Sequence, residues 1–246
     1  GSTSGGIPVS STYAGLFGPG TWDWLQSAMA GNDDLIAAQL PVNINGTPAN
    51  DTLLGNALNN TITGGAGLDT VGFSGARGNY NINITGTTVV VTDLVAGRDG
   101  TDTLTNVERL RFADKSVALD LNASAGVVAK VMGAVFGKTS LASLPSVGLG
   151  LKLMDSGMVY TDLMQYALTA RLGTGASDAV VVNLLYTNVV GVAPGAAELT
   201  YFTGLLRAGQ YTQATLGVLA AETPSNVANI NLTGLASTGL EYVPQA

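Results

Sequence analysis

Apolar and polar positions follow two different patterns along the chain, and the change falls near residues 121–125. Before it, residues 80–84 and 117–121 alternate apolar and polar side chains, and Thr88–Thr92 is β-branched throughout. Alternation with period two and β-branched runs are typical of half-buried strands. The first half of the chain is therefore predicted to be rich in β-strands.

The second half instead has apolar residues at helical spacing, with Pro-Gly and similar breaks between the periodic segments. Helices are expected over Ala125–Phe136, Met158–Leu172, Asp178–Val190, Ala196–Arg207 and Thr212–Ala221. The short connections predict a compact all-α bundle over residues 122–246. A β-rich half followed by a helical half places the chain in the α+β class.

Residues 1–45 precede both patterns and are interpreted as an N-terminal extension. Thr21–Leu40 has apolar residues at helical spacing with a break at Gly31, which predicts one or two short helices. Trp22 and Trp24 lie in this segment. They are interpreted as packing residues in preference to a platform for stacking sugars.

Between the extension and the alternating strands, the chain repeats in nines. Written from Gly46, it reads GTPANDTLL, GNALNNTIT and GGAGLDTVG. Each unit begins with Gly and carries an aliphatic residue at its eighth position, and the sixth position holds Asp51, Asn60 and Asp69 in turn. Residues 46–121 are therefore predicted to form a short parallel β-roll followed by a β segment.

The spacing within each unit suits calcium. Glycines such as Gly65 and Gly67 permit positive φ and close backbone approach, so a turn can direct its carbonyls inward. Calcium takes about six to eight oxygen ligands, including carboxylates and backbone carbonyls. One unit reverses the chain, so residues 18 apart stack, placing Asp51 with Asp69 and leaving Asn60 alone on the opposite side. One good calcium site is expected between the Asp51 and Asp69 turns.

Other positions in the repeats limit or extend this prediction. The first unit has Thr47 and Ala49 where glycines are preferred, which weakens its turn. A fourth copy, GRDGTDTLT at Gly97–Thr105, lies out of tandem, and its Asp99 and Asp102 provide a second candidate set of ligands. The alternative is a Gly/Asn-rich hairpin array without metal, and this alternative is favoured for the second unit taken alone.

Composition narrows the function classes. Charged residues make up 11 % of the chain, against about 25 % usually, and the net charge of −7 with no basic patch argues against nucleic acid as a partner. The chain contains no His and no Cys, which excludes Ser-His-Asp and Cys-His catalysis but leaves carboxylate-pair chemistry open. Glu108, Arg109 and Arg111 are interpreted as solvated or locally paired. Polar residues interrupt the apolar run Ala179–Ala197, so no transmembrane segment is expected.

The repeats continue into Phe73–Leu119, FSGARGNYNINITGTTVVVTDLVAGRDGTDTLTNVERLRFADKSVAL. Together they resemble secreted bacterial RTX exoproteins, whose calcium-binding nonapeptide has the form GGxGxDxUx. The resemblance implies calcium as the cofactor, type I secretion through an uncleaved C-terminal signal, and folding outside the cell where calcium is plentiful. It implies an extracellular or cell-surface location. The absence of Cys fits a chain exported unfolded.

Leu184–Leu232 resembles a helical domain common at the ends of RTX-type exoproteins. It is also similar to the helical domain of alphaproteobacterial surface-layer proteins that binds lipopolysaccharide. The shared elements are GVAP at Gly191–Pro194, the following Ala-rich helix, and Glu222 with Asn226. The resemblance implies lipopolysaccharide or another cell-surface polysaccharide as partner. The aromatic residues of this half are interpreted as helix-packing core, with glycan stacking as the alternative: Tyr160, Tyr166, Tyr186, Tyr201, Phe202 and Tyr211.

Two functions remain in view. The first is a secreted, calcium-dependent cell-surface protein, surface-layer-like or adhesive, whose helical domain contacts a glycan, lipopolysaccharide or another copy of itself. The second is the C-terminal secretion and folding module of a larger exoenzyme. An enzyme in its own right is disfavoured by the missing His and Cys. The sequence identifies no glycan-binding residue.

Overall fold

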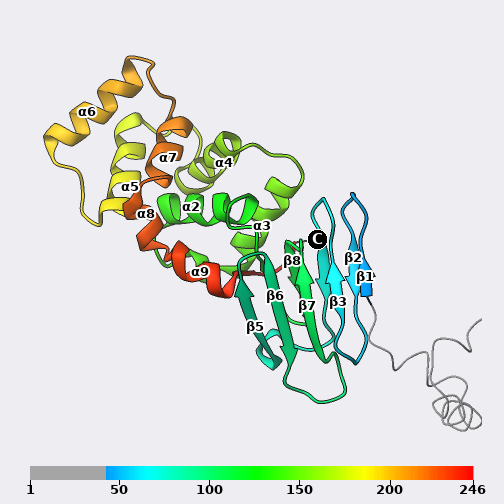
Figure 1. Cartoon of the computed structure of the whole chain (residues 1–246). Helices are drawn as coiled ribbons and strands as arrows, with labels where there is room; N and C mark the ends of the chain where they lie inside the picture. Colours follow the sequence, from blue (N-terminus) through cyan, green and yellow to red (C-terminus); the bar gives the residue numbers. More distant parts are fainter. Residues whose placement is uncertain (1–42, 246) are drawn as a thin grey trace, which may run out of the picture. The chain divides into compact units, whose positions relative to one another are not determined.

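The first strands of the protein are three residues long and recur every nine residues (Figure 1). The structure is a computed structural model that describes residues 43–245. These strands are β1 (Asn43–Asn45), β2 (Thr52–Leu54), β3 (Thr61–Thr63) and β4 (Thr70–Gly72). Ile44 pairs with Ile62 and Leu53 with Val71, both in parallel. Each pairing joins residues 18 apart, which confirms the predicted coil of two repeat units.

A hairpin interrupts this coil without ending it. β5 (Tyr80–Thr85) and β6 (Thr88–Asp93) pair antiparallel, and the chain returns to the coil at β7 (Thr101–Thr105) and β8 (Arg109–Arg111). β7 pairs in parallel with β3 and β8 with β4, which matches Ile62 with Leu104 and Val71 with Leu110. The out-of-tandem copy at Gly97–Thr105 therefore rejoins the stack of repeats.

Two mixed five-stranded sheets result. Their orders are β1-β3-β7-β6-β5 and β10-β9-β8-β4-β2, with β9 at Ser116–Ala118 and β10 at Leu240–Tyr242. The repeat strands β3, β4, β7 and β8 each place one fully buried aliphatic side chain between the sheets, and none of Ile62, Val71, Leu104 and Leu110 is exposed. Because each of these short strands contributes a single core side chain, the turns between them matter for the stability of the roll.

The second half is helical, which confirms the predicted α+β class (Figure 1). The helices are α2 (Ser124–Phe136), α3 (Leu144–Asp155), α4 (Tyr160–Leu172), α5 (Asp178–Val190), α6 (Ala196–Arg207), α7 (Gln213–Ala221), α8 (Pro224–Asn229) and α9 (Leu232–Thr238). All five predicted helices are present, whereas α3, α8 and α9 were not anticipated. α2 buries Val128, Val131 and Val135 and packs against α3, α4, α5 and α7. α6 buries no residue and packs on α5.

Contacts of the C-terminal strand and of one buried arginine join roll and bundle into one compact unit. β10 pairs antiparallel with β9, and the next residue, Val243, donates its N–H to Leu144 O at the start of α3. Arg109 of β8 is 3 % exposed and forms an ion pair with Asp120. Its Nη2 also donates to both carboxylate oxygens of Asp155 at the end of α3, at 2.9 and 3.1 Å.

The predictions for the N-terminal segment fall outside the described residues. They include the helices over Thr21–Leu40 with Trp22 and Trp24, and most of the predicted 1–45 extension. Asn43–Asn45, at the end of that extension, belongs to the roll through its pairing with β3. Among the described residues, no helix is both long enough and apolar enough to cross a membrane.

Candidate metal centre

Two repeat turns lie one on the other along one edge of the roll. Asp51 N donates to Asp69 Oδ1 at 2.8 Å, so the two acidic residues form a column, as their 18-residue spacing predicts. A Cβ on Gly65 would lie 2.3 Å from Thr47 O, and one on Gly67 would meet the first turn in the same way. Both glycines also have positive φ, at 116° and 118°. They therefore allow the backbones of the two turns to approach closely.

A third turn, which the sequence did not reveal, continues this column. Asp69 N donates to Glu108 Oε2 at 2.9 Å. Glu108 therefore accepts from the backbone of Asp69 in the same way as Asp69 accepts from the backbone of Asp51. Asn106 follows β7 as Gly64 follows β3, and it takes a left-handed conformation that is uncommon for residues other than glycine, with φ of 52°. A Cβ on Gly64 would lie 1.9 Å from Asn106 O, the same close approach that Gly46 makes to Gly64 O. Glu108 was expected to be solvated or locally paired, and it belongs instead to the column.

Asp69 lies at the centre of the column and has the least satisfied carboxylate there. Its side chain is fully buried, and while Oδ1 accepts from Asp51 N, Oδ2 has no hydrogen-bond partner among the described residues. Asp51 differs, because its Oδ2 accepts from Thr47 N at 2.6 Å and from Thr47 Oγ1 at 2.9 Å. A buried carboxylate oxygen without a donor costs about 1–3 kcal/mol or more. A bound cation would remove that cost.

The opposite edge of the roll carries a second, less acidic column. Asn60 N donates to Asp102 Oδ1 at 2.8 Å. The prediction that Asn60 lies alone on this side was therefore wrong. The hairpin is inserted between the third and fourth repeat units, so β7 of the fourth unit pairs with β3 of the second. Both side chains are 2 % exposed. Burial raises the pKa of Asp102 to about 6, while the bond from Asn60 N acts to lower it and the charge of Asp99 acts to raise it. This edge provides one carboxylate and one amide.

Asp99 holds the base of the hairpin and lies apart from the Asp51–Asp69 column. Its carboxylate accepts from Ser74 N at 2.8 Å, from Ser74 Oγ at 2.9 Å and from the Tyr80 hydroxyl. Burial, and then this bond to Asp99, raise the pKa of Tyr80 to about 12. With three protein donors on its two oxygens, Asp99 is occupied by hairpin contacts.

The donor set of the first column suits calcium. No group of three or more His, Cys, Asp or Glu side chains gathers at one point within residues 43–245. A cation at this edge would therefore depend on few carboxylates and several backbone carbonyls, which is the mixture that calcium accepts and zinc does not. The unpartnered Asp69 Oδ2 and the crowded turn carbonyls fit such an ion.

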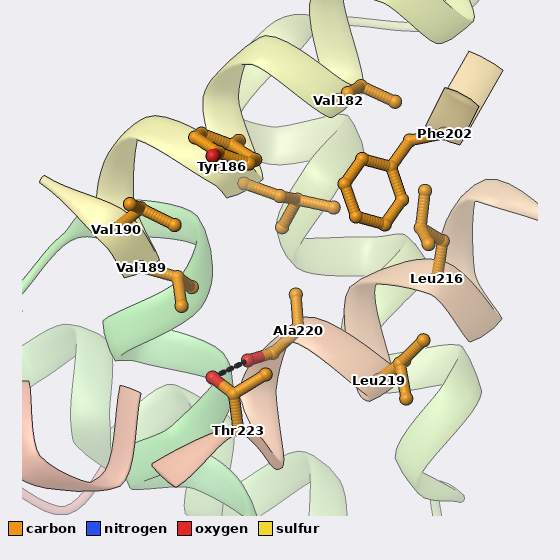
Figure 2. Close-up of a pocket in the computed structure, with 10 residues that line it drawn as sticks. Val182, Tyr186, Val189, Val190, Phe202, Leu216, Leu219, Ala220 and Thr223 are labelled. Atoms are coloured by element: carbon orange, nitrogen blue, oxygen red, sulfur yellow. Dashed lines mark hydrogen bonds between the residues drawn. The ribbon is translucent and has the colours of Figure 1, made fainter. Parts of the chain in front are cut away.

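The helical half has an apolar groove of about 370 Å³ between α5, α6 and α7 (Figure 2). Tyr186 of α5 and Phe202 of α6 face it, with their ring centroids 6.3 Å apart. The Thr223 hydroxyl at its edge donates to Ala220 O at 2.8 Å. The other lining residues are aliphatic: Val182, Leu185, Val189, Val190, Leu216, Leu219 and Ala220. Two of the predicted packing aromatics thus line an open surface.

Comparisons with protein-family models, with curated proteins and with solved structures find no match for this chain.

Proposed function

We propose that this is a secreted, calcium-binding cell-surface protein. Its β-roll becomes stable when extracellular calcium reaches the Asp51–Asp69 edge, and its helical half makes the contact with a partner. The observation that supports this proposal is the fully buried Asp69 carboxylate, which has one oxygen without a protein donor in a column of stacked turns.

The same feature explains why calcium would control folding. Without a cation, the buried carboxylate of Asp69 is left partly unsatisfied, which lowers the stability of the folded roll. Extracellular calcium modules with few charged ligands bind with Kd values of about 10⁻⁴–10⁻³ M. Such a site is empty in a calcium-poor cytosol and filled outside. The roll would then fold after export.

Asp69→Asn tests the metal, because it keeps the shape and removes the charge. Calcium at about 100 times its Kd should stabilise the native protein by about 2.7 kcal/mol, which raises Tm by about 5–10 °C for a chain of this size. In Asp69→Asn this calcium-dependent rise should disappear. In chelator the variant should melt above the native protein, because the unsatisfied buried charge is gone.

The matched control is Asp162→Asn, which removes one exposed carboxylate from the first turn of α4. It should keep the full calcium response when melting is followed by circular dichroism. A native protein whose Tm is the same in calcium and in chelator would refute the calcium proposal.

For the helical half we propose binding to lipopolysaccharide, with the apolar groove taking its lipid part. The groove has almost no free polar group, which suits a hydrocarbon chain better than a sugar. Val190 and Leu219 in its lining are 52 % and 46 % exposed, a large apolar exposure for two residues of one groove.

Co-sedimentation with vesicles that contain lipopolysaccharide tests this contact. Leu219→Asp should weaken binding about tenfold or more by placing a charge in the groove. Val180→Asp is the control, because Val180 is an exposed valine of α5 that does not line the groove. Equal binding by both variants and the native protein would refute the groove as the contact. Sedimentation equilibrium would then show whether the helical half associates with itself.

A further inference from the structure

The two oxygens of Asp69 face different turns. Oδ1 accepts from the N–H of Asp51 in the first turn. Oδ2 lies 2.6 Å from the position that a Cβ on Gly64 would take, and Asn106 O lies 1.9 Å from the same position on the third-turn side. The unpartnered oxygen therefore lies at the step between the second and third turns. Only a glycine at residue 64 leaves this space open.

The step between the first and second turns has no comparable oxygen. Asp51 Oδ2 is the equivalent atom there, and Thr47 donates to it through both its N–H and its hydroxyl. Thr47 stands at the position where Gly65 stands in the second turn, and Gly65 with its φ of 116° makes no such bond to Asp69. Asp51 Oδ2 is thus satisfied by two protein donors, whereas Asp69 Oδ2 has none among the described residues.

The third turn supplies the missing partners. Glu108 accepts from Asp69 N through Oε2, and its other oxygen, Oε1, takes no part in that bond. Glu108 and Asn106 also line a hollow of about 400 Å³, together with Asp120, Asn122 and several aliphatic side chains. Calcium commonly keeps water among its ligands, and solvent in this hollow can reach Glu108.

The charges at this step are unbalanced in the direction that favours a cation. Asp69 and Glu108 are successive carboxylates of the column, joined through Asp69 N and Glu108 Oε2, and neither forms an ion pair among residues 43–245. Arg109 directs its guanidinium to Asp120 and Asp155 instead. Two neighbouring carboxylates of the column are therefore left without a positive partner in the described part of the chain.

We propose that Glu108 and the Asn106 carbonyl complete a calcium site with Asp69 Oδ2, so that the ion binds between the second and third turns. This rests on the calcium-binding function proposed above and changes its ligands. Glu108 replaces Asp51 as the second carboxylate. The ligand Glu108 then directly precedes Arg109, whose bond to Asp155 joins the roll to α3.

Isothermal titration of the chelator-treated full chain with calcium chloride distinguishes the two steps. Glu108→Gln keeps an acceptor for Asp69 N but loses the charge, and it should weaken calcium binding about tenfold or more. Asp51→Asn is the matched variant in the same column, and it should change the affinity less than about threefold. The reverse order, a large loss in Asp51→Asn and none in Glu108→Gln, would overturn the third-turn site and leave the calcium function standing.

Two further outcomes are decided by the same experiment. No heat of calcium binding in the native protein would refute the proposed function itself. If Glu108→Gln lacks the helical circular dichroism of the native chain, Glu108→Asp replaces it, because it keeps the charge and shortens the reach by one methylene. An affinity in Glu108→Asp equal to that of the native protein would also overturn the site.

Discussion

Asp102→Asn gives a quantitative test of the second column. The substitution keeps the oxygen that accepts from Asn60 N and removes a charge from a side chain that is 2 % exposed. Burial raises the pKa of Asp102 from its ordinary 3.8 to about 6. Each pKa unit is worth about 1.36 kcal/mol, so the ionised carboxylate should cost the calcium-free fold about 2–3 kcal/mol at neutral pH.

The sign of the pH dependence follows from the raised pKa. Between the unfolded and folded pKa values the folded state binds more protons, so Asp102 weakens the fold as pH rises from 3.8 to about 6. Above that range the whole cost is present, and below it the cost vanishes. The variant should therefore exceed the native protein by about 2–3 kcal/mol near pH 7.5 and equal it near pH 4.

Urea denaturation in chelator, followed by circular dichroism across this pH range, measures the difference directly. Comparing the variant with the native protein at each pH cancels the titration of the other carboxylates. A difference that is independent of pH, or a variant less stable than the native protein at pH 7.5, would refute the assignment of a buried, destabilising charge to Asp102.

Two other predictions concern the turns and the junction. Gly64→Ala should reduce Tm sharply in thermal melts, because its Cβ would lie 1.9 Å from Asn106 O, whereas Gly204→Ala in α6 meets no atom within 4 Å and should stabilise by about 0.5–1 kcal/mol. A Tm for Gly64→Ala equal to the native value would contradict the close stacking of the turns. Arg109→Met should lower the free energy of unfolding, measured by urea denaturation, by about 3–5 kcal/mol, because Asp120 and Asp155 lose their buried partner. A loss below 1 kcal/mol would mean that the ion pairs do not hold roll and bundle together.

The sequence predicts the elements of this fold that have a fixed period. The nine-residue frame is enough to place Asp51 beside Asp69, because two short strands and two turns close one coil. The helical spacing likewise gives α5 and α6 with their observed ends. In both cases the information is local, so one segment is sufficient to establish it.

What the sequence hides depends on distant parts of the chain. The pairing of Asn60 with Asp102 requires the intervening hairpin to be recognised as an insertion, and no local signal states where the coil resumes. Glu108 is hidden for a related reason, since its turn is shorter than a repeat unit and uses Asn106 in place of glycine. The helix α3 was not predicted, because glycines within a segment usually indicate a break in a helix. In the structure, Gly148 and Gly150 instead allow close contact with Val243 and Val128.

The pairing of β10 with β9 also has a consequence in time. Leu240 lies opposite Ala118, so the sheet that contains β2, β4 and β8 takes its last strand from beyond the entire helical half. Contacts that close such long loops form slowly, and β9 remains an open edge until residues 240–242 have been synthesised. The order of synthesis thus delays completion of the roll until the helical half exists. A chain still emerging from the ribosome cannot close this sheet, whatever the ion concentration around it.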